Sequence, residues 1–392
     1  MNTRRVFLRD SAIAMFVVGA APAWLARAAN STSGKRRILV AIFQRGAADG
    51  LNIVVPHGDP NYYALRPGIA IPKTDVLDLD GFYGLHPALA ALKGIYDSGP
   101  LAIVEAVGSP DPTRSHFDAQ DYMESGTPGL KATPDGWLNR ALGGGAKAQS
   151  PVRAVAIGPT VPRILRGPNA AVAVSKLSEF QVRDPGSAAT FESLYTSAVD
   201  RVLSGTGKDT FNAVRTLQAI GREPGARYPG GRLGESLQQI ARMIKADVGL
   251  EVAFADMGGW DTHVNQVAPL TNLLTGFGQA VAAFYQDLGD KMEDVAIVTM
   301  SEFGRTASEN GNRGTDHGHA NVMFVLGGGV RGGKVYGEWP GLSREQLYEG
   351  RDLALTTDFR DVLSEVAAKY LGSNPGAVFP NHTTSKRHGY FN

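Results

Sequence analysis

Apolar and polar positions alternate along this chain in blocks that predict strands separated by helices. Residues 37–43 (RILVAIF) are almost continuously apolar, which is typical of a strand buried on both faces. Five further segments predict strands: 101–107, 153–157, 250–255, 295–300 and 321–326. Helical patterns cover 86–96, 270–291 and 358–371. This order favours an α/β fold, doubly wound, with a mainly parallel sheet and helices on both faces.

The same pattern sets the expected domain boundaries. Residues 29–35 are small and polar and predict a linker, after which 36–392 form a single α/β domain. A helical insertion is predicted around 189–246. Residues 327–332 satisfy G-x-G-x-x-G, but the residues after them do not begin a helix, so a turn is favoured over a dinucleotide site.

Polar side chains cluster where the predicted strands end. Asp49 follows the first strand, and GGWDTH brings Asp261 and His263 after the fourth. Glu302 directly follows the fifth strand, and a further group, DHGH at 316–319, precedes the last. Because the carboxyl ends of parallel strands share one edge of a sheet, we expect these groups to meet there.

Together these groups predict a divalent metal site. The candidate ligands are Asp49, Asp261, His263, Glu302, Asp316, His317 and His319. Carboxylate oxygens and imidazole nitrogens suit Zn, Mn or Fe better than an ion that seeks thiolates. Each group also has an ordinary alternative: a turn residue for the aspartates, a salt bridge from Glu302 to Arg305, and a hydrogen-bonded loop residue for the histidines.

A second group of candidates surrounds a predicted helix start. Ser115 is either the N-cap of that helix or a hydroxyl nucleophile toward a phosphoryl or sulfuryl centre, and the sequence leaves both open. His116 and Thr113 are alternatives for the functional residue. Arg45 and Arg114 are the candidates to bind equatorial phosphate oxygens.

The first residues predict export. TRRVFLR at 3–9 matches a twin-arginine motif, an uncharged stretch follows over 11–25, and ARA at 26–28 fits an A-x-A cleavage site. The expected signal peptide is 1–28, and its apolar stretch, which contains glycine and proline, is too short for a stable membrane anchor. We therefore expect passage through the twin-arginine translocase to the periplasm or the medium.

Composition narrows the chemistry further. The chain has no cysteine, which excludes disulfides, thiolate metal sites and a cysteine nucleophile. Removing residues 1–28 changes the formal net charge from +1 to −2, so no basic surface for nucleic acid is expected. Trp137, Trp260 and Trp339 leave a carbohydrate-binding alternative, although dispersed tryptophans more often pack in a core.

Several motifs, in order, resemble one known family. QRGAADGLN, TRSHFDAQDYMESG, GGWDTH, SEFGRT and GTDHGHAN followed by LGGGVRGG, together with the export signal, are similar to the twin-arginine-exported bacterial family called domain of unknown function fifteen-oh-one. That family is placed in the alkaline phosphatase and sulfatase-like superfamily. The resemblance implies an alkaline phosphatase-like α/β fold with a two-metal hydrolytic centre at the strand ends.

The resemblance also implies roles for individual residues. Asp49 matches the superfamily's first metal ligand, and Asp261 and His263 resemble its Asp and His pair at one metal position. Ser115 lies where the superfamily's nucleophile begins a helix.

Two departures limit this comparison. Glu302 falls where the superfamily has Asp-His-Gly, but the adjacent His is missing, and His317 or His319 would be the late histidine. Pro110 stands where sulfatases carry the residue converted to formylglycine, so that cofactor is expected to be absent. The sequence thus predicts an exported, metal-dependent hydrolase of phosphate or related esters carried by a small molecule or a polymer. The alternative is a non-catalytic member of a secretion or cell-surface assembly system that retains the fold.

Overall fold

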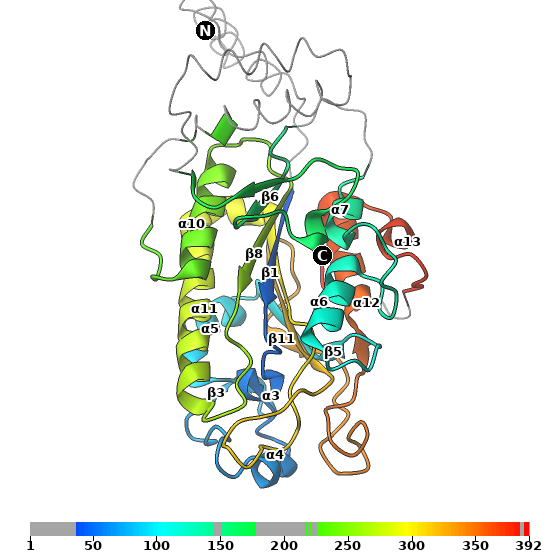
Figure 1. The fold of residues 1–392 in the computed structure, drawn as a ribbon. Coiled ribbons are helices and arrows are strands. Elements are labelled where there is room, and N and C mark those ends of the chain that lie inside the picture. Colours follow the sequence, from blue (N-terminus) through cyan, green and yellow to red (C-terminus); the bar gives the residue numbers. More distant parts are fainter. Residues whose placement is uncertain are drawn as a thin grey trace, which may run out of the picture. The chain divides into compact units, whose positions relative to one another are not determined.

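A single large sheet determines where each candidate residue lies. The computed structural model describes residues 37–143, 150–177, 216–217, 220, 226–384 and 388–391. The strand order is β11-β5-β10-β9-β1-β8-β6-β7, with β12 paired to β5 (Figure 1). The strands are β1 (Ile38–Gln44), β5 (Leu101–Gly108), β6 (Ala154–Ile157), β7 (Val172–Val174), β8 (Val252–Met257), β9 (Val295–Met300), β10 (Asn321–Gly327), β11 (Lys334–Tyr336) and β12 (Thr357–Asp358).

All of these strands except β10 point the same way. β1 pairs in parallel with β8 and with β9, so that Val40 lies opposite Ala253 on one side and Ile297 on the other. β10 runs antiparallel to both of its neighbours, β9 and β5. Because β9 ends and β10 begins at the same edge, the connection 301–320 stays at that edge, beside the ends of β1 and β8.

Helices cover both faces of the sheet (Figure 1). Successive side chains of β1 point to opposite faces, so Val40 and Ile42 join one core and Ala41 and Phe43 the other. The helices on the first face are α5 (Ala90–Asp97), α10 (Arg232–Lys245) and α11 (Val267–Leu288). Those on the second are α6 (His116–Ser125), α7 (Trp137–Ala141), α12 (Phe359–Leu371) and α13 (Pro375–Val378). The predicted α/β class with a mainly parallel sheet is therefore confirmed.

Shorter elements complete the described chain. They are α3 (Gly50–Ile53), α4 (Pro60–Leu65), and a small antiparallel sheet of β2 (Val54–Val55), β4 (Gly84–Leu85) and β3 (Leu77–Asp78). The 3-10 turns are Pro87–Leu89, Arg163–Leu165 and Gly289–Asp294. The glycines at 327–332 lead into β11 and not into a helix, as the sequence indicated.

The long helix α11 belongs to the core. With the turn after it, the segment is long and apolar enough to cross a membrane by length and composition alone. However, Leu274, Phe277 and Phe284 are fully buried against the sheet and the neighbouring helices. The predicted segments 1–28 and 29–35, and most of 189–246, lie outside the described residues, so the domain boundaries stay a prediction.

Candidate metal centre

Four residues from three distant segments of the chain come together at the carboxyl edge of the sheet. α6 supplies His116 as its first residue. The loop after β8 supplies Asp261 and His263, and the connection from β9 to β10 supplies His317. We call these four residues the histidine–aspartate cluster. His116 and His317 are 201 positions apart in the chain.

Local backbone conformation lets these loops approach one another. The Ser115 hydroxyl accepts a hydrogen bond from Asp118 N–H, which caps α6 and fixes His116 as its first residue. Gly46, in the turn after β1, has a φ of +117°, and a Cβ atom there would lie 2.7 Å from Asp261 N. Only glycine therefore allows the turn after β1 to contact the Asp261 backbone.

The Nε2 atoms of the three histidines converge on one another. His317 Nε2 lies 3.0 Å from both His116 Nε2 and His263 Nε2. Asp261 Oδ1 is 2.9 Å from His263 Nε2 and 3.2 Å from His317 Nε2. Asp261 Oδ2 is 3.5 Å from His116 Nε2. All four side chains are partly exposed, and burial lowers the pKa of His317, which favours its neutral ring.

Each of these rings also has an acceptor at Nδ1, on its other side. The pairs are His116 with Glu302 Oε1 at 2.8 Å, His263 with Asp316 Oδ1 at 3.0 Å, and His317 with the backbone oxygen of Arg114 at 2.9 Å. Because carboxylate and carbonyl oxygens only accept hydrogen bonds, Nδ1 carries the proton in each ring. In its neutral form an imidazole of this kind presents the lone pair of Nε2, and all three Nε2 atoms face the cluster.

The charges around the cluster favour positive charge at its centre. Asp261, Glu302 and Asp316 contribute three negative charges and Arg305 one positive charge, which leaves two negative charges. Either two protons on the imidazoles or one divalent cation can balance them. Metal-binding histidines are commonly oriented by an acceptor at the other ring nitrogen, as all three are here. The donor set therefore fits a divalent cation that takes N and O ligands, such as Zn²⁺.

Glu302 is a buried anion behind the cluster. Its side chain is fully buried, and Oε1 accepts hydrogen bonds from His116 Nδ1, from Gly46 N–H at 2.9 Å and from Gln120 Nε2 at 2.9 Å. Burial alone would raise the pKa of Glu302, but the hydrogen bonds from His116, Gln120 and backbone N–H groups outweigh it and hold the pKa below its usual range. The bond to Glu302 in turn raises the pKa of His116.

Arg305 holds the aspartate of the cluster. Its Nη1 donates to Asp261 Oδ1 at 2.8 Å and its Nε to Thr315 Oγ1 at 3.1 Å, and its side chain is fully buried. Partial burial would raise the pKa of Asp261, but the hydrogen bond and charge of Arg305 outweigh it and lower the pKa. The alternative of a salt bridge from Glu302 to Arg305 is wrong, because the guanidinium pairs with Asp261.

Asp49 forms a separate, deeper ion pair. Its Oδ2 accepts hydrogen bonds from Arg66 Nη1 at 2.7 Å and from Gln266 Nε2 at 2.6 Å. Gln266 then accepts from Thr315, which links the pair to the buried guanidinium behind the cluster. Asp49 is therefore not a member of the histidine–aspartate cluster, and Arg66 supplies its counter-charge.

Two further candidates lie near the cluster with other partners. The buried ring of His319 stacks on Tyr348, with ring centroids 4.5 Å apart, and burial lowers the pKa of His319. Ser115 is exposed, and its hydroxyl faces the first turn of α6, 3.5 Å from Asp118 N. The helix-cap interpretation of Ser115 is thus confirmed, while its role as a nucleophile stays a prediction.

Arg45 and Arg114 are both paired with carboxylates. Arg45 donates to Glu124 at 2.8 Å and to Asp256 at 2.9 Å. Arg114 donates to the buried Asp352 at 2.6 Å. Phosphate binding by either guanidinium stays a prediction, and it would have to compete with these carboxylates.

Sequence reasoning missed the groups that support the histidines. The Phe303 ring lies against both His116 and His317, with centroids 5.0 Å apart in each pair. Gln120 bonds to the same carboxylate oxygen as His116. The spacing of His116 and Gln120, four positions apart, places them on one face of α6 and could have indicated their common partner. No comparable signal marked Phe303.

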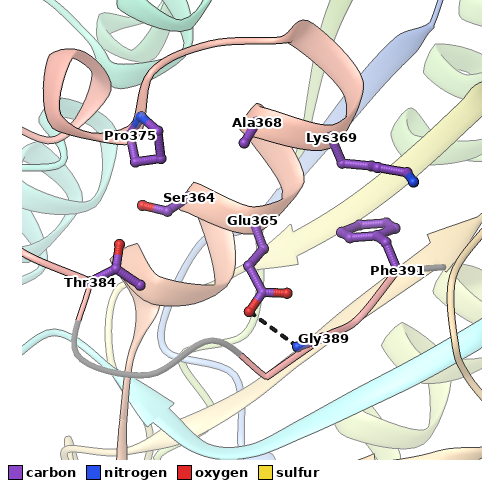
Figure 2. A pocket seen from close by; sticks show the side chains of 8 residues that line it. All are labelled: Ser364, Glu365, Ala368, Lys369, Pro375, Thr384, Gly389 and Phe391. Atoms are coloured by element: carbon purple, nitrogen blue, oxygen red, sulfur yellow. Dashed lines mark hydrogen bonds between the residues drawn. The ribbon is translucent and has the colours of Figure 1, made fainter.

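A pocket of about 420 Å³ lies beside α12, away from the cluster (Figure 2). Among the described residues that line it, Glu365 is the only one with a carboxylate, and it accepts hydrogen bonds from the backbone N–H groups of Gly389 and Tyr390. Arg37 directly precedes β1 and donates to the backbone oxygen of Lys369, which also lines the pocket. The pocket therefore lies near the beginning of β1, whereas the cluster lies beyond the end of that strand.

The fold and the cluster define an α/β protein with a candidate metal centre at the carboxyl edge of its sheet. The chain belongs to the family described as protein of unknown function (DUF1501), whose model matches residues 102–378. The family resemblance of the motifs is therefore confirmed. A comparison with curated proteins gave no match.

Solved structures show distant likenesses. The C-terminal periplasmic domain of EcEptC from Escherichia coli, in complex with Zn, is 10% identical, with a TM-score of 0.37 over 76% of this chain and 74% of that one. The lipoteichoic acid synthase LtaP from Listeria monocytogenes is 9% identical, with a TM-score of 0.41 over 91% and 78%. The PsFucS1 sulfatase from Pseudoalteromonas sp. is 12% identical, with a TM-score of 0.38 over 95% and 80%. At TM-scores below 0.5, these likenesses assign no activity.

Proposed function

We propose that this protein is an exported hydrolase of phosphate or related esters that works with one divalent cation held by the histidine–aspartate cluster. The observation that supports this is the convergence of three Nε2 atoms and one carboxylate, with every imidazole oriented by an acceptor at Nδ1. His116, Asp261 and His317 form the most compact set, with ligand atoms within 4.8 Å of one another. His263 is the fourth group, and four N and O ligands suit Zn²⁺.

A single ion is favoured over a two-metal centre. The other candidate carboxylates are already engaged: Glu302 with His116, Asp316 with His263, and Asp49 with Arg66. Arg66 is fully buried and also donates to the backbone oxygens of Thr306 and Ala307. Displacing it from Asp49 would leave a buried charge without its partner, which typically costs about 3–5 kcal/mol. Asp49 and Arg66 are therefore a structural pair beneath the site.

The chain's own residues prepare the centre for an ester. When bound, a divalent ion acts as a Lewis acid toward a phosphoryl or sulfuryl oxygen. Arg305 donates to Oδ1 of Asp261 and favours the ionised carboxylate, which would hold the ion as an anionic ligand. Asp261 and His263 are also the more exposed members of the cluster. An ester carried by a small molecule or by a polymer can therefore approach from this side.

Metal analysis and an ester assay test this proposal. Wild-type protein should carry about one Zn²⁺ or Mn²⁺ per chain and hydrolyse at least one member of a panel of phosphate and sulfate esters. His317→Ala should lose both the ion and the activity. His319→Gln is the matched control, because it changes a nearby histidine outside the cluster and should keep both.

The absence of a bound ion from the wild type, or full activity in His317→Ala, would overturn the proposal. A bound ion without turnover of any ester would instead support the non-catalytic alternative, in which the fold holds a structural ion.

Export rests on the N-terminal motif alone. In the double variant Arg4→Lys, Arg5→Lys, we expect the protein to accumulate in the cytoplasm of a bacterial host that has the twin-arginine translocase. Fractionation of the host and detection of the protein in each compartment measure this. Equal export of the double variant and the wild type would contradict it.

A further inference from the structure

Two of the large apolar side chains that are exposed among the described residues directly follow residues of the histidine–aspartate cluster. The large ones are Phe117 (90% exposed), Leu130 (47%), Val264 (56%) and Val267 (48%). Phe117 directly follows His116, and Val264 directly follows His263. A single exposed apolar residue is ordinary, but two that adjoin histidines of one polar site favour a surface for a ligand.

These side chains contribute little to the core. The apolar residues that α6 buries are Ala119, Tyr122 and Met123, whereas Phe117 is almost fully exposed. Val264 lies in the loop between β8 and α11, outside both elements. Full burial of a side chain of this size contributes about 1.5–3 kcal/mol, of which Phe117 gains almost nothing and Val264 only a part within the chain. A bound molecule that covered them would gain it.

Phe117 and Val264 also come from different elements that meet at one point. The Nε2 atoms of the preceding residues, His116 and His263, each lie 3.0 Å from His317 Nε2, so the backbones that carry Phe117 and Val264 approach each other at the cluster. A molecule bound at the cluster would therefore lie near two segments, each of which carries an apolar residue next to a histidine of the cluster.

We propose that Phe117 and Val264 form an apolar rim that binds an aryl or alkyl group of the ester substrate. This inference rests on the proposed function, because the ester must be held at the cluster for its apolar group to reach the rim. The rim favours esters with an apolar substituent next to the phosphate or related group, and it gives no advantage to esters with a purely polar one.

Binding of phosphonates, which are not hydrolysed, tests the apolar rim separately from the proposed hydrolase function. Metal content is measured first, and isothermal titration of the metal-loaded protein then compares phenylphosphonate with methylphosphonate. Wild type should bind the phenyl compound about tenfold more tightly, as expected for partial burial of a phenyl ring. The double variant Phe117→Ser, Val264→Ser should lose this preference but keep the bound ion and its affinity for methylphosphonate. Leu130→Ser is the control, because it removes an exposed apolar side chain that does not adjoin a cluster residue.

Each other outcome overturns one proposal in particular. Equal affinities for the two phosphonates in a wild type that holds its ion overturn the apolar rim and leave the proposed function intact. A wild type without an ion overturns the proposed function, and the rim with it. A wild-type dimer that the double variant dissociates, without any preference for the phenyl compound, shows a contact between chains and also overturns the rim.

Discussion

Replacing Glu302 by glutamine tests whether the carboxylate behind His116 sets the cation affinity. The change keeps the shape of the side chain but removes the negative charge that accepts from His116 Nδ1. The donors His116 Nδ1, Gly46 N–H and Gln120 Nε2 all meet Oε1, so the glutamine carbonyl can still accept from them while its NH₂ group replaces Oε2 beside Ser301 Oγ. Removing acceptors of this kind typically costs about 10–100-fold in metal affinity, or about 1.4–2.7 kcal/mol. Because Glu302 is fully buried, we expect the upper part of that range.

Competition with a chelator of known affinity measures the Kd for Zn²⁺. Asp316→Asn makes the matching change behind His263, but Asp316 is about half exposed, so solvent screening should reduce the loss to about tenfold or less. Glu345→Gln, an exposed site on another loop, is the control and should leave the Kd unchanged. Unfolding curves of all variants check that the fold is retained. If Glu302→Gln binds Zn²⁺ as tightly as the wild type does, the carboxylate does not orient a ligand.

Three further predictions concern the helix cap, the ion and a buried acid. Because the Ser115 hydroxyl caps α6, Ser115→Ala should lower the free energy of unfolding by about 0.5–1 kcal/mol and keep most of the ester hydrolysis. A rate loss of about a thousandfold would instead identify the hydroxyl as the nucleophile. Removal of the ion with EDTA should lower the Tm of the wild type and leave the Tm of His317→Ala unchanged. An ion at 100 times its Kd stabilises the folded state by about 2.7 kcal/mol. Burial raises the pKa of Glu105 well above its ordinary value, so its contribution to stability is full below the unfolded-state pKa of about 4.3 and is lost as the pH rises toward the folded-state pKa. Relative to wild type, Glu105→Gln should therefore be more stable at pH 7 than at pH 4. Urea titrations that show the same difference in the free energy of unfolding at both pH values would contradict this.

Apolar runs predicted the strands of the sheet well. The runs at 295–300 and 321–326 match β9 and β10 to within one residue, because strands buried on both faces carry an unbroken apolar signal. The direction of β10 could not be predicted, since the same run fits either direction. That direction depends on pairing with β9 and β5, and it keeps the connection 301–320 at the edge where the cluster forms.

The sequence also predicted which residue types would gather, but not which would pair. Glu302 and His116 were both candidates, yet only the structure shows that the carboxylate lies at Nδ1 while Nε2 faces the cluster. Likewise, nothing in the sequence connects Asp49 with Arg66, which lies at the end of α4. Such choices depend on side-chain directions within a few ångströms, and these are set by the packing of separate loops.

The 201 positions between His116 and His317 also bear on the order of events during folding. Closing a loop of this length is entropically unfavourable until the strands beneath it have paired. The imidazoles can therefore meet only late, after β1, β8 and β9 have aligned. On the proposed function, the cation therefore does not nucleate folding but binds after the sheet has assembled.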